Sequence, residues 1–581
     1  MKIDFSSILR KRFHLPHAET TRKAVHSFSL TERVVFWVLF AIFALSALIM
    51  LVKVNNHFLV SVPVKGGELT EGILGSPRFV NPLLAISDAD RDVTALVYSG
   101  LLRATPNGEL VPDLADRYEI SEDGLTYTFF LKEDIRFHDG TALTADDVEF
   151  TLTKAQEPNL KSPRRANWEG VTIEKISDKE IRFILKQPYA PFLENVTLGI
   201  LPKHIWKNAT VDEFAFSEYN ILAIGSGPYK IRDVNRNSAG LPNEYVLRAN
   251  SSFALGEPYI GTLRLKFYGN EASLAEALES ADVESVNSLS AALVKEFENN
   301  GRRVETAVLP RVFGVFFNQN EATLFTNKEV RMALNEAIDK NTLVKNILSG
   351  YGSAIDGPIP READPSIGDL ATSSEAFILK AQATLENAGW KKNEETGVYE
   401  KKGKSSTMSL AFSIATGDAP ELKHSAAIIE ETWEKLGASV DVEIYETGDL
   451  NQSVIRPRKY SSLLFGEIIG RNMDLFPFWH SSQRNDPGLN IALYVNNSAD
   501  RLLEQARTIT DTDERNAKYS EFEEKIKEDT PAVFLYSPSF LYIVPKKIEN
   551  LRLGGLTVPS DRFLGIHTWY IETSKVWKIF N

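Results

Sequence analysis

The dominant feature of the hydrophobic pattern is a long apolar run near the N-terminus. Residues 34–52 carry no charge and are followed directly by Lys53; they read VVFWVLFAIFALSALIMLV. As an α-helix this run spans roughly 28 Å, close to the hydrocarbon thickness of a bilayer. A cleaved signal peptide would have an apolar region of about 7–15 residues that ends in an A-x-A-like site, whereas Ala44-Leu45-Ser46 lies inside the run. A buried core helix would show a polar face. We therefore predict a retained membrane anchor.

Basic residues before the run predict its orientation. They are Arg10, Lys11, Arg12, Arg22, Lys23 and Arg33. Because such residues stay on the cytoplasmic side of a membrane, the rest of the chain is expected outside. We predict a basic cytoplasmic segment over 1–33, a transmembrane anchor over 34–52 and a tether over 53–65. The protein would then be a single-pass protein of the cell membrane, with its main body extracellular or periplasmic.

Beyond the tether, patterns typical of strands and helices alternate. Hydrophobic residues alternate on both sides of Asp123-Gly124, which predicts a hairpin. Thr144 with Asp146-Asp147 is typical of a helix N-terminus. Residues 408–444 read as strand, helix and strand, with Pro420 opening the helix and Gly437 ending it. A unit of this length predicts two parallel strands with a right-handed crossover, so the fold class is α/β.

Two further helices have clear sequence signals. Thr326-x-x-Glu329 is a capping box that precedes the apolar positions Val330, Leu334, Ala337 and Ile338. The second helix places Ile378, Ala381, Leu385 and Ala388 on one face and stops at Gly389.

The net charge and the lack of cysteine exclude several classes of function. The chain has a net charge of −13 and no cysteine. An acidic surface repels phosphate backbones, so nucleic acid is not an expected partner. The lack of cysteine excludes disulfides, cysteine metal sites, thiol nucleophiles and a lipidated N-terminal cysteine.

Motifs of enzymes and metal sites are missing as well. The chain has no HExxH, GxxxxGK[ST] or GxSxG sequence. Gly225-Ser226-Gly227-Pro228 is read as a tight turn, because Pro228 removes an amide that a phosphate site would use. His138-Asp139-Gly140 is read as a turn before it is read as a metal ligand or general base. We expect no catalytic residues, no metal and no cofactor.

Residues 114–150 carry a more specific signal. They read LADRYEISEDGLTYTFFLKEDIRFHDGTALTADDVEF. This segment resembles the signature of the peptide/nickel class of ABC-importer solute-binding proteins, the dipeptide- and oligopeptide-binding protein family. Further segments resemble that family in the same order along the chain: 97–102, 107–112, 225–230, 317–340, 350–360 and 381–390.

The resemblance implies a two-lobed periplasmic-binding-protein-like fold with an extra subdomain in lobe I. Lobe I would comprise 66–97, 215–310 and 530–581, the inserted subdomain 98–214, and lobe II 311–529. The ligand would bind between the lobes, which close by a hinge motion. The partners implied are ABC permease subunits and, through them, ATPase subunits. The protein would act as a monomer, with peptide as the leading ligand and nickel chelates, opines or saccharides behind it.

The resemblance also implies where the ligand binds, although the match departs from the family there. In peptide binders of this family a lobe II segment with a glycine and an aromatic residue precedes an Asp that holds the ligand ammonium. Here the segment begins with Phe465-Gly466, Glu467 takes the aromatic position, and Gly470 or Arg471 takes that of the Asp. Glu467 or Asp474 is the alternative anion for an amine, and Arg471 the alternative partner for a carboxylate or phosphate. Trp479 and His480 would line the cleft from lobe II, and Ser87 and Asp88 from lobe I.

Two rival functions remain open. One is a two-lobed sensor or binding protein that is not coupled to transport. The other is an anchored extracellular hydrolase, which the missing catalytic motifs disfavour.

Overall fold

The computed structural model describes residues 27–360, 374–403, 406–471, 473–509 and 511–577. Of the predicted cytoplasmic segment, residues 1–26 lie outside the described residues. The chain divides into two compact units. One is Met1–Val64 with Thr573–Asn581, and the other is Lys65–Glu572.

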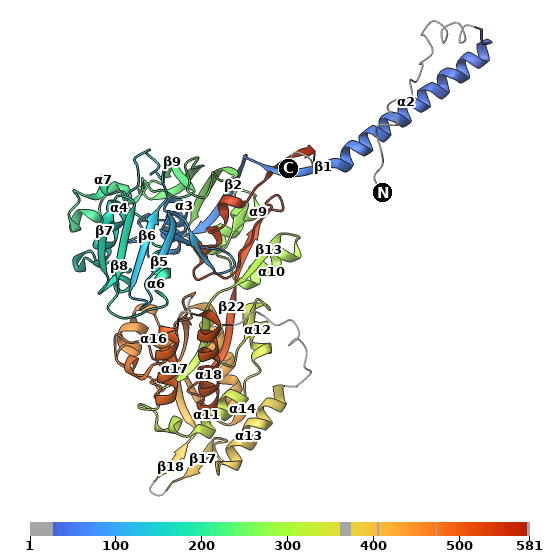
Figure 1. The fold of residues 1–581 in the computed structure, drawn as a ribbon. Coiled ribbons are helices and arrows are strands. Elements are labelled where there is room, and N and C mark those ends of the chain that lie inside the picture. Colours follow the sequence, from blue (N-terminus) through green and yellow to red (C-terminus); the bar gives the residue numbers. More distant parts are fainter. Residues whose placement is uncertain (1–26, 361–373, 404–405, 472, 510, 578–581) are drawn as a thin grey trace, which may run out of the picture. The chain divides into compact units, whose positions relative to one another are not determined.

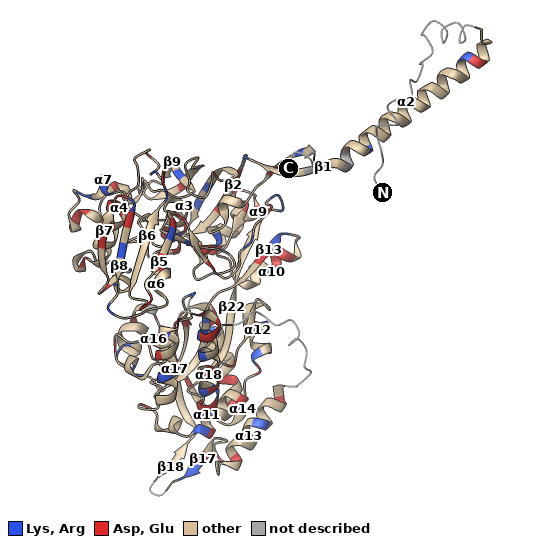
Figure 2. Ribbon diagram, viewed as in Figure 1, with Lys and Arg blue, Asp and Glu red and all other residues tan. Residues whose placement is uncertain are grey.

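The smaller unit consists of helix α2 (Leu30–Phe58) and two strands, β1 (Leu59–Val64) and β23 (Glu572–Trp577), which pair with each other. Among the described residues, α2 is the one helix long and apolar enough to cross a membrane, and Figure 2 shows its middle free of charged residues. The helix runs six residues past the predicted anchor, because 53–58 contains neither Gly nor Pro to stop it. The tether predicted over 53–65 is therefore partly helix and partly strand.

The larger unit contains two lobes (Figure 1). Their hydrophobic cores are separate. Buried residues of the lobe I cores come from 69–309 and 540–569, whereas those of the lobe II cores come from 312–536. Each lobe thus packs around its own apolar interior, as the hydrophobic pattern of an α/β chain requires.

Lobe I is a mixed sheet with helices packed against it. Strand β2 pairs in parallel with β11 and β12, and β9, β10 and β11 form an antiparallel meander. Its elements are β2 (Gly66–Leu74), α3 (Asp88–Val97), β9 (Tyr229–Arg236), β10 (Pro242–Ala249), β11 (Ile260–Tyr268), α9 (Glu271–Glu279), β12 (Ser285–Val286), α10 (Ala291–Asn299) and β13 (Arg303–Val308), with the 3-10 helices η7 (Pro559–Phe563) and η8 (Ile566–Thr568) near the C-terminus.

An inserted subdomain adds a four-stranded antiparallel sheet in the order β5-β6-β8-β7 and a short hairpin of β3 and β4. Its apolar residues belong to the same core cluster as those of lobe I. Its elements are β3 (Leu102–Ala104), β4 (Leu110–Pro112), β5 (Ala115–Ile120), β6 (Thr126–Leu131), α4 (Ala145–Gln156), α5 (Arg165–Trp168), β7 (Thr172–Ser177), β8 (Glu180–Ile184), α6 (Phe192–Asn195), α7 (Lys203–Trp206) and α8 (Val211–Phe214).

Lobe II is built around the strand order β20-β19-β21-β14-β22. Strands β19 and β20 are parallel and joined by α14, so the predicted crossover unit is confirmed. Its elements are β14 (Arg311–Phe317), α11 (Lys328–Glu336), α12 (Lys340–Leu348), β15 (Gly352–Ala354), α13 (Ser374–Asn387), β16 (Lys391–Lys392), β17 (Tyr399–Lys402), β18 (Thr407–Ser409), β19 (Ala411–Gly417), α14 (Pro420–Leu436), β20 (Ser439–Tyr445), β21 (Ser462–Ile468), α16 (Phe476–Trp479), α17 (Asn497–Thr508), α18 (Thr512–Asp529) and β22 (Ala532–Val544).

Two segments cross between the lobes. Strand β22 pairs with β14 in lobe II through 532–536 and with β13 in lobe I through 539–544. The second crossing is Leu309-Pro310, which joins β13 to β14. The two crossings touch where the Ser537 hydroxyl donates to the Leu309 carbonyl at 3.2 Å. Two adjacent crossing segments are a suitable basis for a hinge.

Local predictions met mixed outcomes. The hairpin at Asp123-Gly124 is confirmed by β5 and β6, with Gly124 at a φ of 67°. The capping box at Thr326 is wrong: Asn327 precedes the first turn of α11, and the Thr326 hydroxyl donates to the Thr323 carbonyl instead. The segment 225–228 is a bend in which neither glycine has positive φ. These glycines are needed because a Cβ at Gly225 or Gly227 would collide with the backbone of Val97.

His138 joins the bend at 225–228 to the turn in which it lies. Its Nε2 donates to the Gly227 carbonyl at 3.1 Å, and its Nδ1 accepts from the Gly225 amide at 3.4 Å. The second bond needs a neutral ring with its proton on Nε2, because a protonated Nδ1 cannot accept. Burial lowers the pKa of His138 to about 4.

We expect His138 to make the fold sensitive to acid. The unfolded chain protonates this ring near pH 6.5, whereas the folded chain does so only near pH 4, so stability falls as pH drops through this window. Replacing His138→Gln should reduce the stability lost between pH 7 and pH 4.5 by about 1–3 kcal/mol. Thermal unfolding of the full-length protein in detergent at both pH values measures this loss. The exposed His424→Gln is the matched control, and an equal loss in both variants would contradict the prediction.

Candidate functional site

A cavity of about 210 Å³ lies where lobe I, the inserted subdomain and lobe II meet. Helix α3 and η7 form its lobe I side, and the inserted subdomain contributes residues of α5 and α6. Lobe II contributes Arg471, which follows β21. A cavity lined from both lobes has the location expected for a ligand site in a hinged protein.

Helix α3 presents one polar face to this cavity. Arg91, Thr94 and Tyr98 line the cavity, and their spacing of three and four residues places them on the same side of the helix. The opposite side is apolar, with Val93 and Leu96 buried in the lobe I core. The apolar side of α3 therefore packs into the lobe I core, and its polar side faces the cavity.

Several cavity-lining polar atoms lack a partner. The atoms are Arg91 Nε, Thr94 Oγ1, Tyr98 OH, Asp113 Oδ1 and Arg471 Nε, which make no hydrogen bond to any residue that the structure describes. Burial raises the pKa of Tyr98, so this hydroxyl stays neutral. Buried polar groups without partners cost about 1–3 kcal/mol each. Their concentration around one cavity indicates a site prepared for a polar molecule.

Two ion pairs neutralise part of the cavity wall. Arg103 Nε contacts Asp113 Oδ2 at 2.8 Å within the inserted subdomain. Arg471 Nη2 contacts Asp561 Oδ2 at 2.8 Å, which joins lobe II to η7 of lobe I. Burial raises the pKa of Glu194, and Asp561 adds to this effect while Arg471 opposes it.

A buried charge cluster holds the lobe I side of the cavity in place. Arg562 Nη1 and Nη2 donate to the two oxygens of Asp92 at 2.8 and 2.6 Å, and Nη2 lies 3.0 Å from Glu71 Oε1. Tyr542 OH donates to the other Glu71 oxygen at 2.8 Å. Burial opposes the charge on Arg562, but the two carboxylates raise its pKa overall. The cluster thereby connects η7, α3, β2 and β22.

A second contact between the lobes lies outside the cavity wall. The Ala190 amide of the inserted subdomain donates to the Arg507 carbonyl of lobe II at 3.2 Å. The Arg507 guanidinium lies 5.6 Å from the Tyr189 ring centroid and 4.0 Å from that of Phe476. Arg507 also binds both carboxylate oxygens of Asp474. Asp474 is therefore already paired with a cation of its own lobe.

Of the nine residues proposed from the sequence, Arg471 lines the cavity. Ser87 caps α3 by accepting from the Asp90 amide at 3.1 Å. Asp88 is the first residue of α3, and its carboxylate lies 3.7 Å from Arg91, which does line the cavity. Phe465 packs against a lobe II core, and Gly466 lies beside the Phe313 ring, where a Cβ would fall 2.7 Å from a ring atom.

Glu467 and Trp479 lie inside lobe II. The carboxylate oxygens of Glu467 and the indole nitrogen of Trp479 have no hydrogen-bond partner among the described residues. Burial raises the pKa of Glu467 well above its usual range, although the nearby Trp479 indole opposes the shift. Burial thus disfavours the charged form of Glu467, which makes it poorly suited to hold a ligand ammonium.

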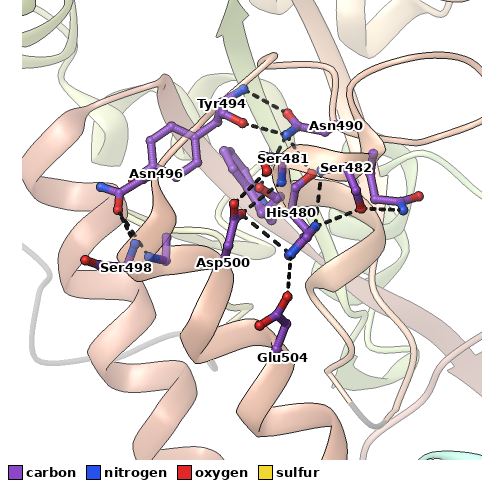
Figure 3. A network of polar contacts seen from close by, with 12 residues as sticks. His480, Ser481, Ser482, Asn490, Tyr494, Asn496, Ser498, Asp500 and Glu504 are labelled. Carbon is purple, nitrogen blue, oxygen red and sulfur yellow. Dashed lines mark hydrogen bonds and ion pairs between the residues drawn. The ribbon is translucent and has the colours of Figure 1, made fainter. Parts of the chain in front are cut away.

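His480 belongs to a polar network of lobe II (Figure 3). Its Nδ1 lies 2.8 Å from the Ser482 hydroxyl and its Nε2 3.4 Å from Glu504. Asp500 accepts from the Ser481 amide and hydroxyl at 2.9 and 2.6 Å. These contacts join the residues after α16 to helix α17. In this structure His480 therefore supports lobe II packing.

Sequence reasoning missed most of the cavity wall. Arg91, Thr94 and Tyr98 could have been predicted from the sequence, because their spacing places them on the polar side of a helix whose opposite side is apolar. Arg164, Glu194 and Asp561 come from short helices or the residues flanking them. They come together only through tertiary packing, and no local spacing marks them.

Comparison with known proteins gives this architecture a context. Residues 109–488 match the model described as bacterial extracellular solute-binding proteins, family 5 Middle. The chain is 29% identical over 525 residues to the oligopeptide-binding protein AppA of Bacillus subtilis (strain 168), which covers 88% of this chain and 92% of the relative.

Solved structures agree with this similarity. The structure of AppA from Bacillus subtilis in complex with a nonapeptide has a TM-score of 0.66 and 28% identity, and the match covers 88% of this chain and 100% of that one. NikZ from Campylobacter jejuni in complex with Ni(L-His) has a TM-score of 0.66 and 27% identity, with 87% and 99% covered.

We expect the buried cluster around Arg562 to be essential for stability. Replacing Arg562→Met leaves Asp92 and Glu71 as uncompensated buried charges, which should cost about 3–5 kcal/mol. Urea or thermal unfolding of the full-length protein in detergent measures the loss. The exposed Arg552→Met is the matched control and should change stability by less than about 0.5 kcal/mol. Equal stability of the two variants would show that the cluster does not hold α3 and η7 together.

Proposed function

This chain belongs to the bacterial extracellular solute-binding proteins of family 5, and from that membership we propose that it captures a peptide or a related small solute for an ABC importer. The family resemblance found in residues 114–150 and the two-lobed α/β fold are both confirmed by the comparisons. The carrying observation is the cavity lined by lobe I, the inserted subdomain and Arg471 of lobe II.

In the proposed mechanism, the ligand enters while the lobes are apart and is enclosed when they close. Closure brings Arg471 to Asp561 and Arg507 to Tyr189, so contacts between lobes form together with contacts to the ligand. The motion is absorbed at the two crossings, Leu309-Pro310 and 537–539. Since the function needs binding and release but no bond breaking, the cavity requires no nucleophile or general base.

Delivery and location complete the proposal. Helix α2 would anchor the protein in the cell membrane with its N-terminus cytoplasmic and residues beyond the helix outside. The closed form would dock on permease subunits powered by cytoplasmic ATPase subunits. Peptide is the favoured ligand because AppA is described as oligopeptide-binding. A metal–amino-acid chelate, as in the NikZ complex, is the next class to test.

Mass spectrometry of solutes released from the purified full-length protein tests the ligand class. We expect a small peptide or peptide-like solute to be released, and adding it back should raise the midpoint of thermal unfolding, because a ligand that binds only the folded state stabilises it. Stabilisation by saccharides alone would contradict the peptide assignment. Uptake of the solute by cells that carry this protein together with its permease subunits distinguishes an import receptor from a sensor.

Hinge closure can be measured directly because the chain has no cysteine. Cysteines introduced at the exposed positions Lys186 and Glu504 place one dye on the inserted subdomain and one on lobe II. We expect energy transfer between the dyes to increase when the stabilising solute is added. A matched pair within lobe II, Lys401 and Glu504, should show no change. Unchanged transfer in the interlobe pair would contradict closure around the ligand.

A further inference from the structure

The charge of the cavity wall differs in sign from that of the chain. Four arginines line the cavity (Arg91, Arg103, Arg164 and Arg471), together with three acidic residues (Asp113, Glu194 and Asp561). Four positive and three negative groups give a net charge of +1, in a chain whose net charge is −13. The cavity wall is therefore more positive than the chain as a whole.

The two internal ion pairs leave specific arginines available. Arg103 is committed to Asp113, and it is almost fully buried. Arg471 uses Nη2 for Asp561, while its Nε has no partner among the described residues. Arg91 reaches Asp88 at 3.7 Å, a weak contact with an exposed carboxylate, and its Nε is likewise unpaired within the described chain.

Arg164 completes the positive group. Burial lowers the pKa of Arg164, the like charge of Arg91 adds to this effect, and Asp561 opposes it. Arg164 thus lies near both Arg91 and Asp561, all three residues line the same cavity, and Arg471 contacts Asp561 directly. Three guanidinium groups on the wall of one cavity, of which Arg471 is paired with Asp561, form an arrangement that a bound anion would complete. Guanidinium groups bind carboxylates and phosphates through paired hydrogen bonds.

The size of the cavity limits the ligand. A cavity of about 150 Å³ holds benzene, so about 210 Å³ accommodates a solute of roughly ten non-hydrogen atoms, close to the size of alanyl-alanine. A nonapeptide exceeds this volume several times. The neutral hydroxyls of Thr94 and Tyr98 add hydrogen-bonding groups for a polar solute.

We infer that the solute is no larger than about a dipeptide and carries a free carboxylate, which Arg91 and Arg164 bind from the lobe I side and Arg471 binds from lobe II. The inference rests on the proposed function and specifies its ligand. The carboxylate would connect the two lobes, because Arg471 is the lobe II residue in the cavity wall. The same anion that is recognised would then also stabilise the closed form.

Calorimetric titration of the full-length protein in detergent tests this inference with two matched probes, alanyl-alanine and alanyl-alanine amide. We expect the free acid to bind roughly ten- to one-hundred-fold more tightly than the amide. The amide would lose one or two charge-assisted hydrogen bonds to the arginines, which corresponds to about this change in affinity. Arg471→Gln and Arg91→Gln should each weaken binding of the acid by a similar factor and leave the amide unchanged. Arg232→Gln, an exposed arginine outside the cavity, should bind both probes as the unmodified chain does.

The outcomes separate this inference from the proposed function. Equal affinity for acid and amide would overturn the carboxylate assignment while leaving solute binding intact. Tighter binding of a nonapeptide than of the dipeptide would overturn the size limit. If neither dipeptide binds but succinate does, and Arg471→Gln abolishes that binding, the carboxylate assignment stands and the peptide assignment fails. If phosphate esters bind and none of the carboxylate probes does, the inference is overturned.

Discussion

The buried ion cluster of Arg562, Asp92 and Glu71 is the interaction on which the rest of the site depends. Arg562 belongs to η7, near the end of the chain, whereas Asp92 and Glu71 belong to α3 and β2, near the start of lobe I. Charges removed from water are tolerated only when they are paired and hydrogen-bonded, so this cluster permits one arrangement of η7 and α3. Their neighbours Asp561 and Arg91 are thereby fixed at the cavity.

The same arrangement explains why the cavity keeps polar atoms that have no hydrogen-bond partner among the described residues. Helix α3 has its apolar stripe in the lobe I core, and its polar stripe cannot turn away without exposing Val93 and Leu96. Arg471 is brought in from lobe II by the residues that follow β21 and is held by Asp561. The stability of the cores therefore maintains a cavity wall whose own hydrogen bonds are incomplete, as is typical of binding sites.

Local patterns predicted the fold class and many elements, because hairpins, caps and alternating strands are encoded by neighbouring residues. Residues 118–131 and 411–445 are examples. The capping box predicted at Thr326 was wrong, because α11 begins after Asn327 and the Thr326 hydroxyl donates to the Thr323 carbonyl instead. The binding site was harder to predict than the fold. Glu467, Trp479 and His480 lie in the interior or in a polar network of lobe II. Arg164, Glu194 and Asp561 come together only after three separate segments of the chain pack. Their proximity depends on tertiary contacts that no short spacing encodes.

The pairing of β1 with β23 has a consequence for biosynthesis. Strand β1 follows helix α2 directly, but its partner β23 is among the last described residues of the chain. This two-stranded ribbon cannot form until the ribosome has finished more than 500 intervening residues. Among the described residues it is thus the last β-pairing that can form during synthesis, and premature termination before β23 leaves β1 without its partner strand.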